Sequence, residues 1–154
     1  MTLWDWSLEI YARPGVEGAC LALQDDHGQC VPFLLWAAWA AVDGRTLSAP
    51  ILACGAAMAL AWEVAAVGPL RQTRRRMKSP LIGMDDDARE AARGQVKTAE
   101  LAAERAVMQA LQALSPPAPG PALPLAPALS DAARAWAPDP PLQALHALAE
   151  NLVG

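Results

Sequence analysis

The sequence predicts an all-α protein, a single small helical bundle of about five helices with a Pro/Ala-rich C-terminal tail. Alanine, the strongest helix former, is the commonest residue, whereas the β-branched and aromatic residues typical of strands are scarce. The length of 154 residues suits one domain. Three cysteines are too few, and odd in number, for a disulfide scaffold. These observations exclude β-sandwiches, β-barrels and most doubly wound α/β sheets.

The first two helices are short, and a helix-breaking segment separates them. Thr2 is placed to cap the first helix. Arg13-Pro14-Gly15 ends it, because proline lacks a backbone donor and disfavours helix in the preceding residue. The second helix is predicted from about Val16 to His27, and Gly28 suits the left-handed conformation that follows many helices.

Two strongly apolar segments predict the centre of the bundle. Pro32 suits the first turn of a helix that runs to about Val42. The second segment, Ile51–Val67, is shorter than the ~20 apolar residues that a membrane-spanning helix needs. It also contains Glu63, so we expect a buried bundle helix and no membrane insertion. The Gly-Pro pair that follows is expected to kink or end the helix, and Leu70–Lys78 to continue as a basic helical extension.

Composition divides the chain after residue 114. Asp85-Asp86-Asp87 suits the start of a long helix over 87–114, since acidic side chains complement the positive end of a helix. Beyond Ser115, most of the 14 prolines alternate with alanine, a composition typical of an extended linker. The sequence therefore predicts a helical bundle domain over 1–114. The remainder, 115–154, is expected to be a flexible Pro/Ala-rich linker with a short C-terminal helix.

The segment Leu70–Lys78 contains five of the 12 basic residues of a chain whose formal net charge is −4. Arg71, Arg74 and Arg75 share one helix face, where they suit phosphate or carboxylate groups. A simpler interpretation is a solvated helix end whose charge is neutralised by the acids at 85–90. No aromatic residue lies among these bases to stack with nucleobases, which disfavours RNA.

Glu63 is the one charged residue of its apolar segment. A buried carboxylate must find a partner or shift its pKa upward. We expect Arg13, Arg45 or Arg71 to pair with it inside the bundle, and a role in ligand binding is the alternative.

The polar run Gln24–Gly28 is the main candidate for chemistry. Asp25 and His27 pair a carboxylate with a group that titrates near neutral pH. The simpler interpretation is a solvated helix end. No obvious nucleophile lies beside them, so we assign no catalytic residue. The cysteines do not form the close ligand pairs typical of zinc sites, so no metal and no cofactor is predicted.

Six tryptophans exceed what a simple core of this size requires. Trp4, Trp36 and Trp39 are the candidates for a groove that anchors a partner. Packing in the core is the alternative for each of them.

Several short motifs occur together in the first two thirds of the chain. They are Trp4-Asp5-Trp6-Ser7, Pro14-Gly15-Val16, Cys20-Leu21-Ala22-Leu23-Gln24-Asp25, His27-Gly28, Leu34-Leu35-Trp36 with Trp39, and Pro69-Leu70-Arg71. Together they resemble a family of small uncharacterised all-helical bacterial proteins, over roughly residues 3–108. The resemblance implies a helical cytoplasmic protein and brings no known activity, cofactor or site residue.

These observations predict a non-enzymatic protein-interaction or adaptor module of the cytoplasm, since no signal peptide opens the chain. A Trp-rich groove would anchor a protein partner, and the basic helix face would set its register. The alternative is a small-molecule binding protein or enzyme, in which Asp25, His27 and Arg71 hold an anionic ligand at a pocket. Association with RNA or the ribosome is a third and weaker hypothesis.

Overall fold

A computed structural model describes residues 1–117 and 120–153 of the chain. Helices make up 74% of the structure, and the described residues contain no strand. The all-α prediction is confirmed, but the expected number of about five helices is wrong. The described residues form seven helices when Ala49–Arg76 is counted as one continuous helix.

Helices α1 (Leu3–Tyr11) and α2 (Val16–Asp25) are the short pair expected near the N-terminus. Thr2 caps α1, because its hydroxyl accepts a hydrogen bond from the Asp5 amide at 3.1 Å. Gly15 adopts the left-handed conformation just before α2, with φ at 83°. Helix α2 ends earlier than predicted, before the turn that contains Gly28.

Helix α3 (Val31–Val42) is the centre of the molecule, and every residue from Val31 to Ala41 is buried. Helices α1, α2, α6 and α7 pack around it. The largest side chain in this core is Trp36, which is fully buried and donates from its indole N–H to the Ser115 hydroxyl at 2.7 Å. A helix that is apolar on every side requires such cover on every side.

One long helix follows, made of α4 (Ala49–Trp62), the π-helical segment η1 (Glu63–Val67) and α5 (Gly68–Arg76). The helix does not end at the Gly-Pro pair, and the expected helical extension is present as α5. The chain instead passes through the wide π-helical turns of η1 just before Pro69, whose missing N–H interrupts the regular hydrogen-bond ladder.

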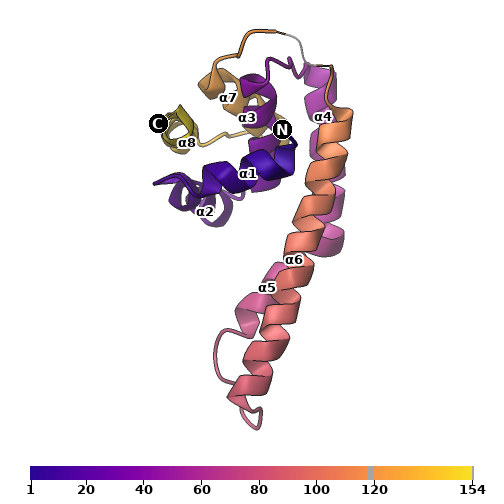
Figure 1. The fold of residues 1–154 in the computed structure, drawn as a ribbon, viewed down its shortest axis with the longest axis vertical. Coiled ribbons are helices and arrows are strands. Elements are labelled where there is room, and N and C mark those ends of the chain that lie inside the picture. The colour runs from indigo at the N-terminus through magenta and orange to yellow at the C-terminus, as the bar shows by residue number, and fades with distance from the viewer. Residues whose placement is uncertain (118–119, 154) are drawn as a thin grey trace.

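Helix α6 (Asp86–Leu114) lies beside this long helix, and the two form a hairpin. Asp85 caps α6 by accepting from the Ala88 amide at 2.9 Å. Helix α5, the loop that follows it and the first part of α6 project beyond the other helices, at the bottom of Figure 1. We call residues 68–100 the arm, and the rest of the described chain the body.

The C-terminal segment forms two further helices, α7 (Leu125–Trp136) and α8 (Leu142–Val153), that pack in the body. Helix α7 lies against α3 and α4, and α8 against α2 and α7. Leu129, Leu145 and Leu148 are fully buried. The expected flexible tail after residue 114 is therefore not confirmed, because each of these helices carries an apolar face that covers part of the core.

Candidate functional site

The basic helix face predicted on α5 lies against acidic side chains of the same chain. Arg71 pairs with three carboxylates, at 2.8 Å from Glu63, 3.4 Å from Glu100 and 3.3 Å from Glu104. Arg74 also pairs with Glu100, through its Nε and, at 3.2 Å, through Nη2. The expected pairing of Glu63 with Arg71 is confirmed.

Arg75 takes part in a separate contact between the arm and the body. Its guanidinium lies 2.7 Å from the Asp25 carboxylate, and both side chains are about half exposed. The Arg75 guanidinium and a hydrogen bond from Gln24 lower the pKa of Asp25, the Gln24 bond contributing most. The neutralising acids thus come mainly from α2, η1 and the middle of α6, rather than from 85–90 as expected.

Three carboxylates and two guanidinium groups meet in this network, so one negative charge is in excess. Burial raises the pKa of Glu104, and this effect exceeds the opposite effect of Arg71. Burial alone would lower the pKa of Arg71, but the surrounding carboxylates outweigh it and raise that pKa. Arg71 is already paired with the carboxylates of this network, so an anionic ligand would have to compete with them for its guanidinium group.

A polar pocket of about 130 Å³ opens beside this network. We define it by the turn Gly28–Cys30, the start of α3, Glu63 of η1, Arg71 of α5 and Trp136 of α7. The Trp136 indole fixes the turn by donating to the Gly28 carbonyl at 2.9 Å. Glu63 reaches the pocket from the π-helical turns of η1. π-helical segments are often found at functional sites.

Gln29 is the unusual residue of the polar pocket. It is 3% exposed, and among the described residues neither its amide nitrogen nor its amide oxygen has a hydrogen-bond partner. Buried amide groups are nearly always paired, because an unpaired one loses its hydration without compensation. Sequence reasoning missed Gln29, although a lone glutamine between a helix-ending glycine and an apolar helix was an available signal.

The pocket has no reactive thiol. Burial raises the pKa of Cys30 to about 12, so its sulfur is protonated at neutral pH. Burial likewise raises the pKa of Cys20 to about 11. Among the described residues, no group of three or more His, Cys, Asp or Glu side chains is arranged to hold a metal ion.

The three residues of the small-molecule alternative do not meet at one pocket. Arg71 lines the polar pocket, whereas Asp25 is engaged by Arg75 outside it. His27 is exposed and lines a separate, shallower pocket with Pro141 and Leu142 at the start of α8. Asp25 and His27 are exposed, whereas Gln29 and Cys30 of the turn after α2 are buried.

The predicted tryptophan anchors have different positions. Trp36 and Trp39 are 0% and 4% exposed, so they belong to the core and cannot contact a partner. Trp4 is half-buried and lines a pocket of about 160 Å³ with Tyr11, where the Arg105 guanidinium lies over its ring. The Trp-rich groove expected from the sequence is thus reduced to Trp4, since the other two rings fill the space around α3.

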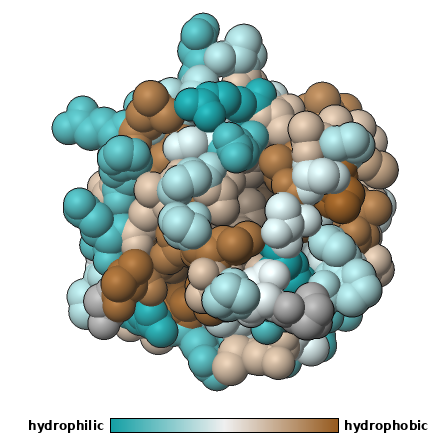
Figure 2. Space-filling model, turned by 90° about the horizontal axis from the view of Figure 1, so that it is seen from above, coloured by the Kyte–Doolittle hydropathy of each residue, from teal (hydrophilic) through white to brown (hydrophobic). Residues whose placement is uncertain are grey.

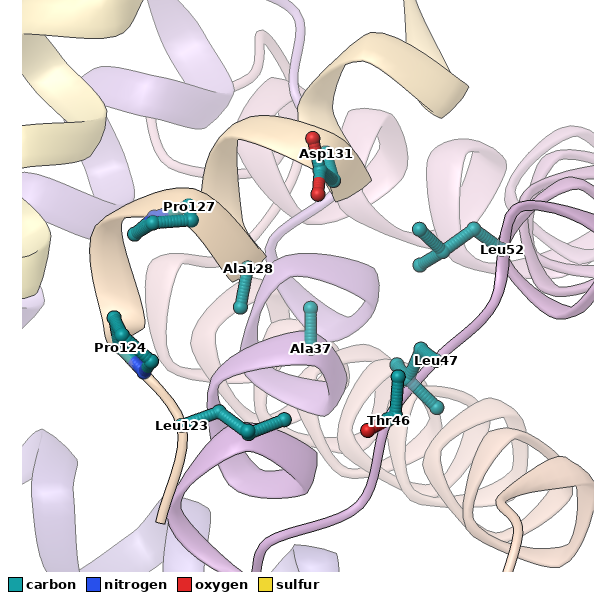
Figure 3. Close-up of a pocket in the computed structure, with 9 residues that line it drawn as sticks. All are labelled: Ala37, Thr46, Leu47, Leu52, Leu123, Pro124, Pro127, Ala128 and Asp131. Carbon is teal, nitrogen blue, oxygen red and sulfur yellow. The ribbon is translucent and has the colours of Figure 1, made fainter.

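A larger and mostly apolar pocket, of about 230 Å³, lies between α3, α4 and α7 (Figure 3). Leu47, Leu52 and Leu123 point toward its middle, and Asp131 lies at its edge. Asp131 already pairs with Arg134 at 3.2 Å. No buried side-chain polar atom of this pocket is unpaired among the described residues, so the pocket reads as imperfect packing of the C-terminal helices rather than as a site.

An exposed apolar surface lies on the long helix. Its side chains follow one another at helical spacing along α4 and η1 and are all exposed. We call this set the outer face of α4: Ala53, Ala57, Leu60, Ala61 and Val64. Leu60 is 53% and Val64 69% exposed. Figure 2, which views the end of the molecule opposite the arm, also shows exposed hydrophobic residues, with one group at the right-hand edge.

By length and composition alone, the helix Ala49–Arg76 would be able to cross a membrane, and only 28% of its most apolar 18-residue window is buried. A core helix of a soluble protein meets the same criterion of length and composition.

Comparison with known proteins gives one match. No curated protein and no solved structure matches the chain. The model of a family described as "Protein of unknown function (DUF2390)" matches residues 2–111, from the cap of α1 to near the end of α6. The chain therefore belongs to the DUF2390 family, as its resemblance to an uncharacterised helical family predicted.

Proposed function

We propose that this protein is a non-enzymatic interaction module of the cytoplasm that binds a partner protein through the outer face of α4. The observation that carries the proposal is the exposure of this face, an uninterrupted apolar strip on the longest apolar helix. Contiguous apolar surface of this kind is typical of interaction sites rather than of free monomer surface. The free cysteines suit a reducing compartment.

The other features of the molecule support an interaction surface more than a catalytic site. Cys30 is protonated and buried, and the Asp25–His27 pair has no shared pocket. Arg71 and Arg74 are engaged by carboxylates, which argues against an anionic ligand or RNA as the main partner of α5. A partner helix laid along the strip would present its own apolar residues at helical spacing.

A double variant, Leu60→Lys with Val64→Lys, tests the proposal. Both side chains are exposed, so the variant should fold, while two buried charges at the centre of an interface should weaken binding at least tenfold. The matched control is Leu21→Lys on α2, an apolar residue that is 46% exposed and lies outside the strip.

The measurement begins with a photo-crosslinking residue placed at Val64 in living cells. A discrete adduct identifies the partner, and titration of the purified pair then gives the affinity of wild type, double variant and control. Sedimentation of the purified protein shows whether the partner is a second copy of the chain. The proposal fails if the double variant binds as tightly as the Leu21→Lys control.

A further inference from the structure

We propose that the polar pocket is a binding site for a carboxamide or urea group, held between the Gln29 amide and the Glu63 carboxylate. This inference is independent of the outer face of α4, because the two surfaces share no residue.

The first argument is the unpaired amide. Gln29 lines the pocket, is 3% exposed, and its buried Nε2 and Oε1 lack partners among the described residues. A ligand would reach this amide by a rotation of the Gln29 side chain toward the pocket. A glutamine at this place offers one donor and one acceptor side by side. A ligand that satisfies both must itself carry an adjacent acceptor and donor, and a carboxamide or a urea has this pair.

The second argument is the charge around the pocket. Glu63 accepts from Arg71 through Oε1, and its side chain is 27% exposed, so Oε2 remains able to accept from a ligand. The network of Glu63, Glu100, Glu104, Arg71 and Arg74 carries one excess negative charge. Ligand carboxylates are therefore disfavoured. A primary amide or urea has a second N–H, which can donate to Oε2 of Glu63.

The third argument is shape. The pocket volume of about 130 Å³ accommodates a small planar group or several waters, but not a large metabolite in full. Pro32 and Trp136 supply apolar walls, and a planar amide can lie against such surfaces. The bound group is thus the end of a larger molecule, or a small amide in its own right.

The test uses propionamide as the probe and the full chain labelled with nitrogen-15. The side-chain NH₂ signals of Gln29 should shift on titration and saturate, with a Kd on the order of millimolar, since so small a ligand has few atoms to contribute. Propionate and methylguanidinium are comparison probes. The first adds a negative charge, and the second lacks the acceptor that Gln29 Nε2 requires, so neither should cause a saturable shift.

Gln29→Leu is the decisive variant, because it replaces an unpaired buried amide with an apolar side chain and should fold at least as stably as wild type. It should abolish the propionamide-dependent shifts of neighbouring pocket residues. Gln109→Leu, on the exposed surface of α6, should leave them unchanged. The inference is overturned if propionamide gives no saturable shift, if propionate binds equally well, or if Gln29→Leu binds like wild type.

Discussion

Glu100 and Glu104 lie one helical turn apart on α6 and both contact Arg71, but their surroundings differ. Glu100 also pairs with Arg74 and its side chain is 7% exposed, so it balances two guanidinium groups. Glu104 is the third carboxylate of the network, and burial raises its pKa. The folded state therefore holds a proton on Glu104 more tightly than the unfolded state does.

The first prediction concerns the pH dependence of this pair. The pKa of Glu104 is raised above 4.5 in the folded state, so protonated Glu104 favours folding. This contribution to the free energy of unfolding is lost as pH rises from the pKa of the unfolded state through the pKa of the folded state. Glu104→Gln should thus be as stable as wild type or more stable at pH 7, and this difference should shrink toward pH 4. Glu100→Gln should destabilise by about 2–4 kcal/mol at pH 7, because two buried or half-buried guanidinium groups lose a partner. Thermal unfolding at both pH values measures the two effects, and equal losses for the two variants would contradict the assignment.

The second prediction concerns the contact between α4 and α3. A Cβ at Gly55 would lie 2.6 Å from Trp36 Cζ3 and 3.2 Å from Leu111 Cδ2. Gly55→Ala should therefore destabilise by about 1–3 kcal/mol through overpacking. Gly94→Ala is the control, since nothing lies within 4 Å of its Cβ position and alanine favours the interior of α6 by up to ~1 kcal/mol. Thermal unfolding of the two variants should shift in opposite directions.

At the scale of single elements, the arm is held by its charged side chains rather than by a core of its own. Arg89 is 7% exposed and donates to the Met77 carbonyl at 2.5 Å and to the Lys78 carbonyl at 3.3 Å. Arg93 donates to the Arg74 carbonyl at 3.3 Å. These bonds satisfy carbonyls at the end of α5 and tie them to α6.

The third prediction is that Arg89→Ala loosens the arm while the body stays folded. Amide hydrogen exchange should become faster from Gly68 to Glu90 and remain unchanged in α3, because α5 packs on α6 and η1 and not on the body core. Arg134→Ala removes an exposed pair on α7 and serves as the control. Uniform acceleration throughout the chain would show that arm and body unfold together.

Most elements were predictable from the sequence, because their signals are local. Thr2, Pro32 and Asp85 mark helix starts as expected, and the apolar run after Pro32 indicates the central helix. At Gly68-Pro69 the sequence predicted a kink or an end, but it did not indicate that the helix would continue through π-helical turns. Charge predicted Arg13, Arg45 or Arg71 as the partner of Glu63, and the fold selects Arg71. The unpaired state of Gln29 depends on burial that the fold imposes.

At the scale of the whole molecule, the core depends on both ends of the chain. Helices α7 and α8 lie outside the matched family region, yet α7 covers α3 and α8 covers α2. Arg13 also donates to the Leu152 carbonyl at 2.7 Å, which joins the turn after α1 to the end of α8. The predicted C-terminal helix is present as α8, but the proline-rich composition did not indicate that α7 and α8 are amphipathic helices that pack on partners about 100 residues earlier.

The fourth prediction is that a chain ending at residue 114 does not fold on its own. Removal of α7 and α8 would expose α3 and α2 residues that are now fully buried, among them Phe33 and Leu23. We expect the truncated chain to lose near-ultraviolet circular dichroism and to bind a hydrophobic dye, as compact states without fixed packing do. A cooperative unfolding transition in the truncated chain would contradict this prediction and support a domain boundary at residue 114.

The position of α3 also affects how the protein is made. The ribosome completes α3 at Val42, but Leu125, where its cover α7 begins, follows 83 residues later. At about 5–20 residues per second, synthesis of the intervening chain takes roughly 4–17 s. For that interval the most apolar helix of the protein has no α7 against which to fold. Nascent chains of this protein should therefore depend on a chaperone at the ribosome until the last two helices emerge.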